Sequence, residues 1–247
     1  MLGPYSLEFN LFLTLVMILV IGKLLFVLYL GKKIYDRKKE TDKLTFGFIH
    51  SVFILYLCLL ISRIIFIYWD FFFTGFDSSR KHLMPGIIWW KIGMLLNAIG
   101  YSAVLFSVDK KFMDFRFRGI FAYIVLGVGV IQLLYPVNTP EDFTLVSNLA
   151  LLSNIVAIVL PIMFIYIGIK TPKTSKYRNL AFIVAIGIII YAIGSNLMVE
   201  SIISSFELNI RIVIYFAFII LKLLGLSLFI FGVVKFIKGF SRSISDE

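Results

Sequence analysis

The chain has 247 residues, of which 60% are hydrophobic and 17% aromatic, whereas only 15% are charged. An ordinary soluble domain carries about 25% charged residues, so this composition excludes one and indicates a polytopic membrane protein. The formal net charge of +10 would favour a nucleic-acid partner in a soluble domain, but we expect no nucleic acid to bind here, because the basic residues follow the predicted membrane topology.

Seven apolar runs follow one another along the chain, and each is predicted to be a transmembrane helix. Most have about the 20 residues that a helix needs to cross the hydrocarbon core. Backbone groups in lipid must be hydrogen-bonded within the protein, which favours helices over open strands. We therefore expect an all-α fold, one seven-helix bundle that spans residues 1–247, with helices at about 9–31, 44–68, 87–108, 119–135, 145–169, 180–199 and 212–234.

Lysine and arginine residues are distributed unevenly between the segments that connect these helices. Seventeen of the 24 lie in segments 32–43, 109–118, 170–179 and 235–247, which hold six, four, four and three. Only three lie in segments 1–8, 69–86, 137–144 and 200–211. Because basic loops stay on the cytoplasmic side, we expect the N-terminus outside and the C-terminus inside. The basic loops would then contact anionic lipids.

The inventory of reactive side chains argues against an enzyme and against a bound metal or cofactor. The chain has one cysteine, Cys58, and two histidines, His50 and His82. That set is too small for a three-histidine zinc site or for a haem held by two histidines. All 14 acidic residues fall outside the predicted helices, so intramembrane aspartyl chemistry is not expected.

Lys222 is the basic residue that lies deepest in the predicted membrane region. At about 1.5 Å per residue, it is about 16 Å or more from Arg211 and Lys235, which flank its helix. That is half of a hydrocarbon core of about 30 Å. An ionisable group at such a depth is costly, so Lys222 is by default a hypothesis for a functional site.

Residues that share a helix face with Lys222 predict that it points into the bundle. Lys222 lies on the same helix face as Tyr215, Gly225, Phe229 and Gly232. Small residues such as these glycines let helices pack closely. In a sequential ring the first and last helices are neighbours, so Lys23 and Lys222 would share one inward cavity. Two cations close together at low dielectric would each be pushed towards the neutral form, and an anionic ligand would relieve that. The alternative is a neutral, hydrogen-bonded lysine with a purely structural role.

Other helices contribute polar residues to the expected interior. The candidate ligand-binding residues are therefore Lys222, Lys23, Tyr215, Asn97, Asn154 and Tyr191. The alternative for the asparagines is interhelical hydrogen bonding, which is common in membrane bundles. Arg63 and Lys91 lie near predicted outer helix ends, where we expect their side chains to reach the interface or to pair with acidic residues.

The position of Lys222 invites comparison with retinal-binding opsins, which attach the chromophore to a lysine of the seventh helix. The surrounding sequence YFAFIILKLLGLSLFIFG has no acidic residue one turn before the lysine, and the third predicted helix has none to serve as a counterion. A protonated Schiff base would have no partner. We therefore expect no retinal cofactor.

At the level of topology, the chain resembles the seven-helix sensor regions that precede histidine kinase modules in bacteria and archaea. The resemblance rests on helix count, orientation and basic turns such as KTPKTSKYRN, which leads into the helix LAFIVAIGIIIYAIGSN. It implies a sensor or receptor of the cell membrane. No kinase follows Glu247, so we expect a protein partner to act as the effector.

Two other functions are consistent with the same pattern. A small-solute transporter would be expected to have broken helices or internal repeats, and neither is visible in the sequence. An accessory subunit of a larger membrane complex would need no ligand pocket. Co-purification with a stable partner would favour the subunit, whereas a monomer that holds a small molecule would favour the sensor.

Overall fold

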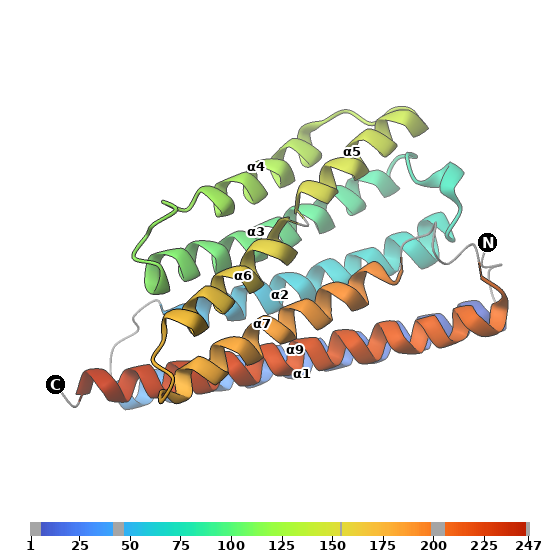
Figure 1. Ribbon diagram of the computed structural model, residues 1–247. Helices are drawn as coiled ribbons and strands as arrows, with labels where there is room; N and C mark the ends of the chain where they lie inside the picture. Colours follow the sequence, from blue (N-terminus) through green and yellow to red (C-terminus); the bar gives the residue numbers. More distant parts are fainter. Residues whose placement is uncertain (1–5, 42–46, 154, 199–205, 246–247) are drawn as a thin grey trace.

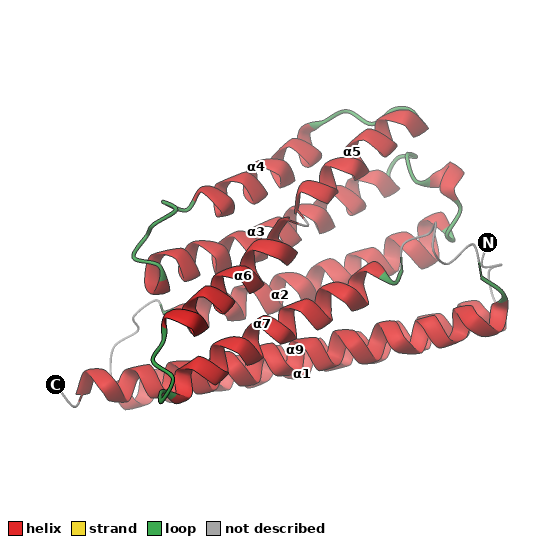
Figure 2. Ribbon diagram, in the orientation of Figure 1, coloured by secondary structure: helices red, strands yellow, loops and turns green. Residues whose placement is uncertain are grey.

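The computed structural model describes residues 6–41, 47–153, 155–198 and 206–245 of the chain. Within these ranges every regular element is helical, and short loops join the helices (Figure 2). In chain order the elements are α1 (Leu7–Thr41), α2 (Phe48–Ile67), η1 (Tyr68–Thr74), η2 (Ser78–Arg80), α3 (Gly86–Phe112), α4 (Ile120–Leu134), α5 (Pro140–Ser153), α6 (Ile155–Lys170), α7 (Lys176–Asn196) and α9 (Leu208–Ser245).

Five of the described helices are long and apolar enough to cross a membrane. They are α1, α2 together with η1, α3, α7 and α9. Two further apolar helices, α4 and the Ile158–Lys170 part of α6, are shorter. The prediction of an all-α integral membrane protein is therefore confirmed.

Several predicted helix boundaries are wrong, because polar or aromatic residues continue the helices beyond the predicted ends. Helix α1 extends to Thr41, well beyond the predicted end at residue 31. Helix α2 runs without a break into the π-helix η1, which ends at Thr74 instead of residue 68. As a result Glu8, Asp70 and Asp109 lie inside helices, and the expectation that all acidic residues lie outside them is wrong.

The predicted fifth helix, 145–169, corresponds to α5 and α6 in the structure. Helix α5 is described as far as Ser153 and α6 from Ile155, and residue 154 lies outside the described residues. Pro161 lies inside α6, where its ring removes one backbone hydrogen bond. The two helices follow one another across the bundle (Figure 1).

The chain folds into a bundle in which the last helix returns to the first. Helix α1 packs against α2 and α9, α3 packs against α2 and α4, and α7 packs against α6 and α9. Figure 1 shows α1 and α9 running along each other for most of their length. The prediction that the first and last helices are neighbours is thus confirmed.

Helices α7 and α9 approach so closely that only glycine fits at their crossing. A Cβ atom at Gly225 would lie 2.6 Å from the backbone nitrogen of Tyr191, and one at Gly187 would lie 2.7 Å from that of Phe229. Small residues at such positions let helix backbones approach in membranes. This contact confirms that the glycine-bearing face of α9 packs against protein, and it fixes the part of α9 that carries Lys222.

Candidate functional site

A cavity of about 340 Å³ lies between the helices, and we call it the interhelical cavity. Residues from seven helices line it: Lys23 of α1, Leu59, Ser62, Arg63 and Phe66 of α2, Met94, Asn97, Ala98 and Tyr101 of α3, Ala150 of α5, Leu160 of α6, Ile188, Tyr191, Ala192, Ser195 and Asn196 of α7, and Lys222 of α9.

Three basic side chains from three helices meet at this cavity. They are Lys23, Arg63 and Lys222, and the lining residues that the structure describes include no aspartate or glutamate. The charges of Lys23 and Arg63 both act on Lys222. The cavity is therefore lined by three basic side chains, one more than the sequence analysis placed there.

Lys23 is bound to the backbone of the neighbouring helix. Its side chain is buried, with a relative exposure of 3%. The Nζ atom donates a hydrogen bond of 2.9 Å to the carbonyl oxygen of Leu59. This bond holds the Nζ atom at the cavity instead of letting it reach the end of the helix.

Lys222 lies against two aromatic rings. Its Nζ atom is 4.5 Å from the ring centroid of Phe218 and 5.4 Å from that of Tyr191. The faces of aromatic rings attract cations, so these contacts partly offset the cost of burying the ammonium group. Gly194 brings α7 close at this level, because a Cβ atom there would lie 3.2 Å from the backbone nitrogen of Lys222.

Arg63 is the basic cavity residue that the sequence analysis did not place at the site. Its guanidinium carbon lies 5.8 Å from the ring centroid of Phe218, and its Nε atom is buried without a hydrogen-bond partner among the described residues. We expected Arg63 near a helix end, but α2 continues through η1 to Thr74, so Arg63 lies deeper. The predicted helix ended at residue 68, five residues after Arg63, whereas the observed helical segment ends at Thr74, eleven residues after it. A prediction with the later end would have placed Arg63 inside the bundle.

Polar residues of α2, α3 and α7 complete the lining. The Ser62 hydroxyl donates a hydrogen bond of 2.6 Å to Oδ1 of Asn97. The Tyr101 and Tyr191 side chains are hydrogen-bonded to each other. These contacts orient Asn97 and Tyr191, both of which the sequence proposed, toward the interhelical cavity.

The structure brings together four of the six residues that the sequence proposed. Lys222, Lys23, Asn97 and Tyr191 all line the cavity, whereas Asn154 lies outside the described residues. Tyr215 is not among the lining residues. Whether any of these residues binds a ligand stays a prediction.

Tyr215 belongs to a different cluster, at the ends of α1 and α9. Its hydroxyl donates a hydrogen bond of 2.7 Å to Oε1 of Glu8, and Arg211 binds Oε2 of Glu8 at 3.0 Å. Phe12 covers the tyrosine ring with a centroid separation of 4.6 Å. Tyr215 is thus committed to an ion-pair network that closes the bundle.

Lys91 also differs from its expected environment. We expected its side chain to reach the interface or an acidic residue, but its Nζ atom donates a hydrogen bond to the carbonyl oxygen of Tyr135 at the end of α4. The backbone of Tyr135 is extended and leaves this carbonyl outside the helical hydrogen-bond pattern. Lys91 therefore caps α4 and is not part of the interhelical cavity.

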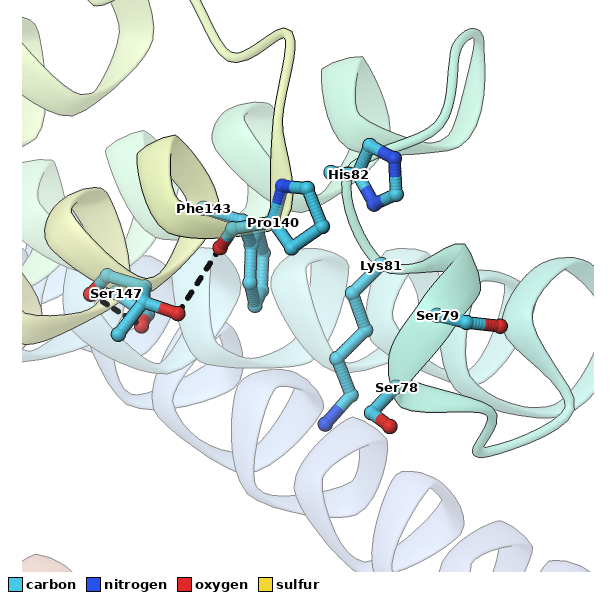
Figure 3. A pocket seen from close by; sticks show the side chains of 8 residues that line it. Ser78, Ser79, Lys81, His82, Pro140, Phe143 and Ser147 are labelled. Carbon is cyan, nitrogen blue, oxygen red and sulfur yellow. Dashed lines mark hydrogen bonds between the residues drawn. The ribbon is translucent and has the colours of Figure 1, made fainter.

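A second cavity, of about 440 Å³, lies between the residues that follow η2 and the start of α5 (Figure 3). Lys81 and His82 line it opposite Pro140 and Phe143, and the side chain of Ser79 points away from them (Figure 3). The hydrogen bonds drawn in Figure 3 lie within α5. Its polar groups do not converge, so we take the interhelical cavity as the candidate site.

The described residues offer no group of three or more histidine, cysteine, aspartate or glutamate side chains that could hold a metal ion. No family model, curated protein or solved structure matches the chain. The functional argument therefore rests on the chemistry of the interhelical cavity itself.

Proposed function

We propose that the chain is a membrane protein of sensor or receptor type that binds an anionic or amphipathic ligand in the interhelical cavity. The observation that supports this most is the meeting of Lys23, Arg63 and Lys222 at one cavity that has no acidic residue among its described lining. Burying charge without a partner is costly. An anion is the ligand class that would lower this cost.

The proposal includes seven membrane crossings, an outside N-terminus and a cytoplasmic C-terminus. Five crossings correspond to the long apolar helices, and α4 and the pair α5 and α6 supply the other two. The orientation is supported by the basic residues that gather in alternate connecting segments. The cell membrane is the proposed location, and a partner protein would carry the signal into the cytoplasm.

A transporter is a second candidate, and one structural observation favours it. Helices interrupted by proline line the substrate sites of many transporters. Pro161 lies inside α6, and the adjacent Leu160 lines the cavity. The same cavity would then be a transport site that opens to each side in turn.

Calorimetric titration of the purified protein with octanoate tests the binding proposal, with octan-1-ol as the uncharged probe. We expect octanoate to bind the wild type, to bind Lys222→Met more weakly by about tenfold or more, and to bind better than octanol. Lys235→Met is the matched control, because Lys235 is exposed on the same helix. Equal binding of octanoate and octanol would contradict the proposal.

Flux measurements separate the two candidates once binding is shown. Proteoliposomes loaded with radiolabelled octanoate should show no protein-dependent release at pH 9, where passive leakage of the acid is lowest, if the protein is a receptor. Release that Lys222→Met abolishes would identify a transporter. A stoichiometric protein partner together with no anion binding would instead favour the accessory subunit.

A further inference from the structure

We propose that Arg63 binds the head group of the ligand and that this head group is the carboxylate of an amphipathic acid. The inference depends on the proposed anion-binding function and specifies its chemistry. It follows from three features of the interhelical cavity: the unequal partners of its cations, the geometry of the donors beside Arg63, and the division of the cavity wall into polar and apolar parts.

The three cations differ in how far the protein already satisfies them. The Lys23 ammonium donates to the Leu59 carbonyl, and the Lys222 ammonium lies over the rings of Phe218 and Tyr191. Arg63 shares the Phe218 ring at a longer distance, and its buried Nε has no hydrogen-bond partner among the described residues. Arg63 thus has the largest unmet capacity to donate hydrogen bonds.

Asp70 does not meet that capacity. Its charge attracts Arg63 from seven residues further along the same helical segment. No hydrogen bond or ion pair joins the two side chains among the contacts of the described residues. Buried donors in proteins are nearly always paired, so an acceptor supplied by a ligand accounts for the orphan Nε.

The geometry at Arg63 favours a carboxylate. A guanidinium group presents parallel N–H donors that match the two oxygens of a carboxylate, whereas lysine acts as a point charge. Ser62 directly precedes Arg63 in α2 and also lines the cavity, and the Ser62 hydroxyl donates a hydrogen bond to Oδ1 of Asn97. That contact leaves the amide N–H groups of Asn97 available to donate to an acceptor in the cavity.

Apolar side chains form another part of the wall, and they would suit an apolar part of the ligand. Phe66, Met94, Leu160 and Ile188 line the cavity together with alanines of three helices. Cavities of about 300 to 1,000 Å³ hold ligands of drug-like size, and this one has about 340 Å³. We infer a single-chain acid with the carboxylate at Arg63 and the chain toward α3, α6 and α7.

Calorimetric titration with octanoate, octyl phosphate and octanamide tests this assignment on the wild type, Arg63→Lys and Lys91→Arg. Arg63→Lys keeps the charge and removes the planar donor pair. We expect it to weaken octanoate binding by about tenfold or more, the loss that corresponds to one charge-assisted hydrogen bond. Octyl phosphate binding should weaken as well, because a guanidinium group also forms two parallel hydrogen bonds with phosphate. The carboxylate assignment therefore predicts that the wild type binds octanoate more tightly than octyl phosphate. Lys91→Arg, outside the cavity, should change neither.

The wild type gives a second readout that does not depend on how the variants fold. It should prefer octanoate to octanamide, which has the same shape and no charge. Binding of the anions with no effect of Arg63→Lys would overturn the role of Arg63, and tighter binding of octyl phosphate than of octanoate would overturn the carboxylate head group. Both outcomes would leave the proposed function standing. Failure of the wild type to bind either anion would overturn both.

Discussion

The Tyr215 hydroxyl donates a hydrogen bond of 2.7 Å to the Glu8 carboxylate and so joins the last long helix to the first. Arg211 binds the other carboxylate oxygen, and the side chain of Glu8 is only 11% exposed. Hydrogen bonds to charged groups contribute roughly 1.5–3 kcal/mol. This small network therefore stabilises the closure of the helix bundle.

Tyr215→Phe should lower stability without changing ligand binding. The substitution removes the hydroxyl and leaves a ring that still packs on Phe12, so we expect a loss of roughly 1.5–3 kcal/mol and an unchanged affinity for octanoate. Unfolding in detergent and calorimetric titration measure the two effects. Tyr123→Phe is the control, because Tyr123 is 60% exposed. A weaker affinity for octanoate at unchanged stability would contradict this prediction and would indicate that Tyr215 belongs to the binding site.

The contrast between Tyr215 and Lys222 shows what helical periodicity can predict. Both residues lie on one face of the last helix, and both point inward as predicted. Periodicity specifies a direction but not a partner along the helix axis. Glu8 was expected in a terminal segment outside the membrane, and only the packing of α1 beside α9 brings it to Tyr215.

The sequence predicted that basic residues meet at one cavity, but it did not predict all of them. An intramembrane lysine without a nearby acid, together with the adjacency of the first and last helices, predicted Lys23 and Lys222 at one cavity. Arg63 was not predicted, because the boundary of α2 was set by the end of the apolar run. Aromatic residues and Asp70 continue that helix as η1, and an apolar-run criterion cannot detect such a continuation.

Gly225→Ala should separate α7 from α9 and disturb the cavity. The new Cβ atom would lie 2.6 Å from the backbone nitrogen of Tyr191 and 2.7 Å from the carbonyl oxygen of Gly187. Backbone atoms cannot turn aside as a flexible side chain can. We expect a loss of roughly 1–3 kcal/mol, as for other overpacked sites, together with weaker octanoate binding.

Gly127→Ala is the matched control for this substitution, because a Cβ atom there meets nothing within 4 Å. Alanine is the better helix former by roughly 0.5–1 kcal/mol, so the control should keep or raise stability. Unfolding temperatures in detergent compare the two variants. If Gly225→Ala were as stable as the control, the close contact between α7 and α9 would not exist in the membrane.

The proposed orientation predicts the labelling of single cysteines. Lys39 is exposed near the end of α1, and Glu141 is exposed in the first turn of α5. In whole cells, Glu141→Cys should react with a maleimide that cannot cross the membrane, whereas Lys39→Cys should react only after permeabilisation. Buried Cys58 serves as the background in the wild type. The reverse pattern would overturn the orientation and exchange the two sides of the cavity.

Lys23 and Lys222 should be energetically coupled in the empty protein. Each single substitution removes the whole repulsion between the two charges. The double substitution removes that same repulsion, so its gain in stability is smaller than the sum of the two single gains. Lys23→Met also removes the hydrogen bond to the Leu59 carbonyl oxygen and leaves that acceptor without this donor. Lys222→Met removes contacts with two aromatic rings instead. The double variant should therefore be less stable than the sum of the single effects predicts, by roughly 0.5–3 kcal/mol, the range found for interacting sites.

Unfolding in detergent of the wild type, both single variants and the double variant measures this coupling. The same series with octanoate tests whether one ligand uses both lysines. A ligand that binds only the folded state raises its apparent stability, so octanoate should stabilise the wild type most and the double variant least. Additivity within about 0.3–0.5 kcal/mol, together with equal stabilisation of all four proteins, would mean that the lysines do not form a shared cationic site. The accessory-subunit function would then be favoured, because it needs no pocket.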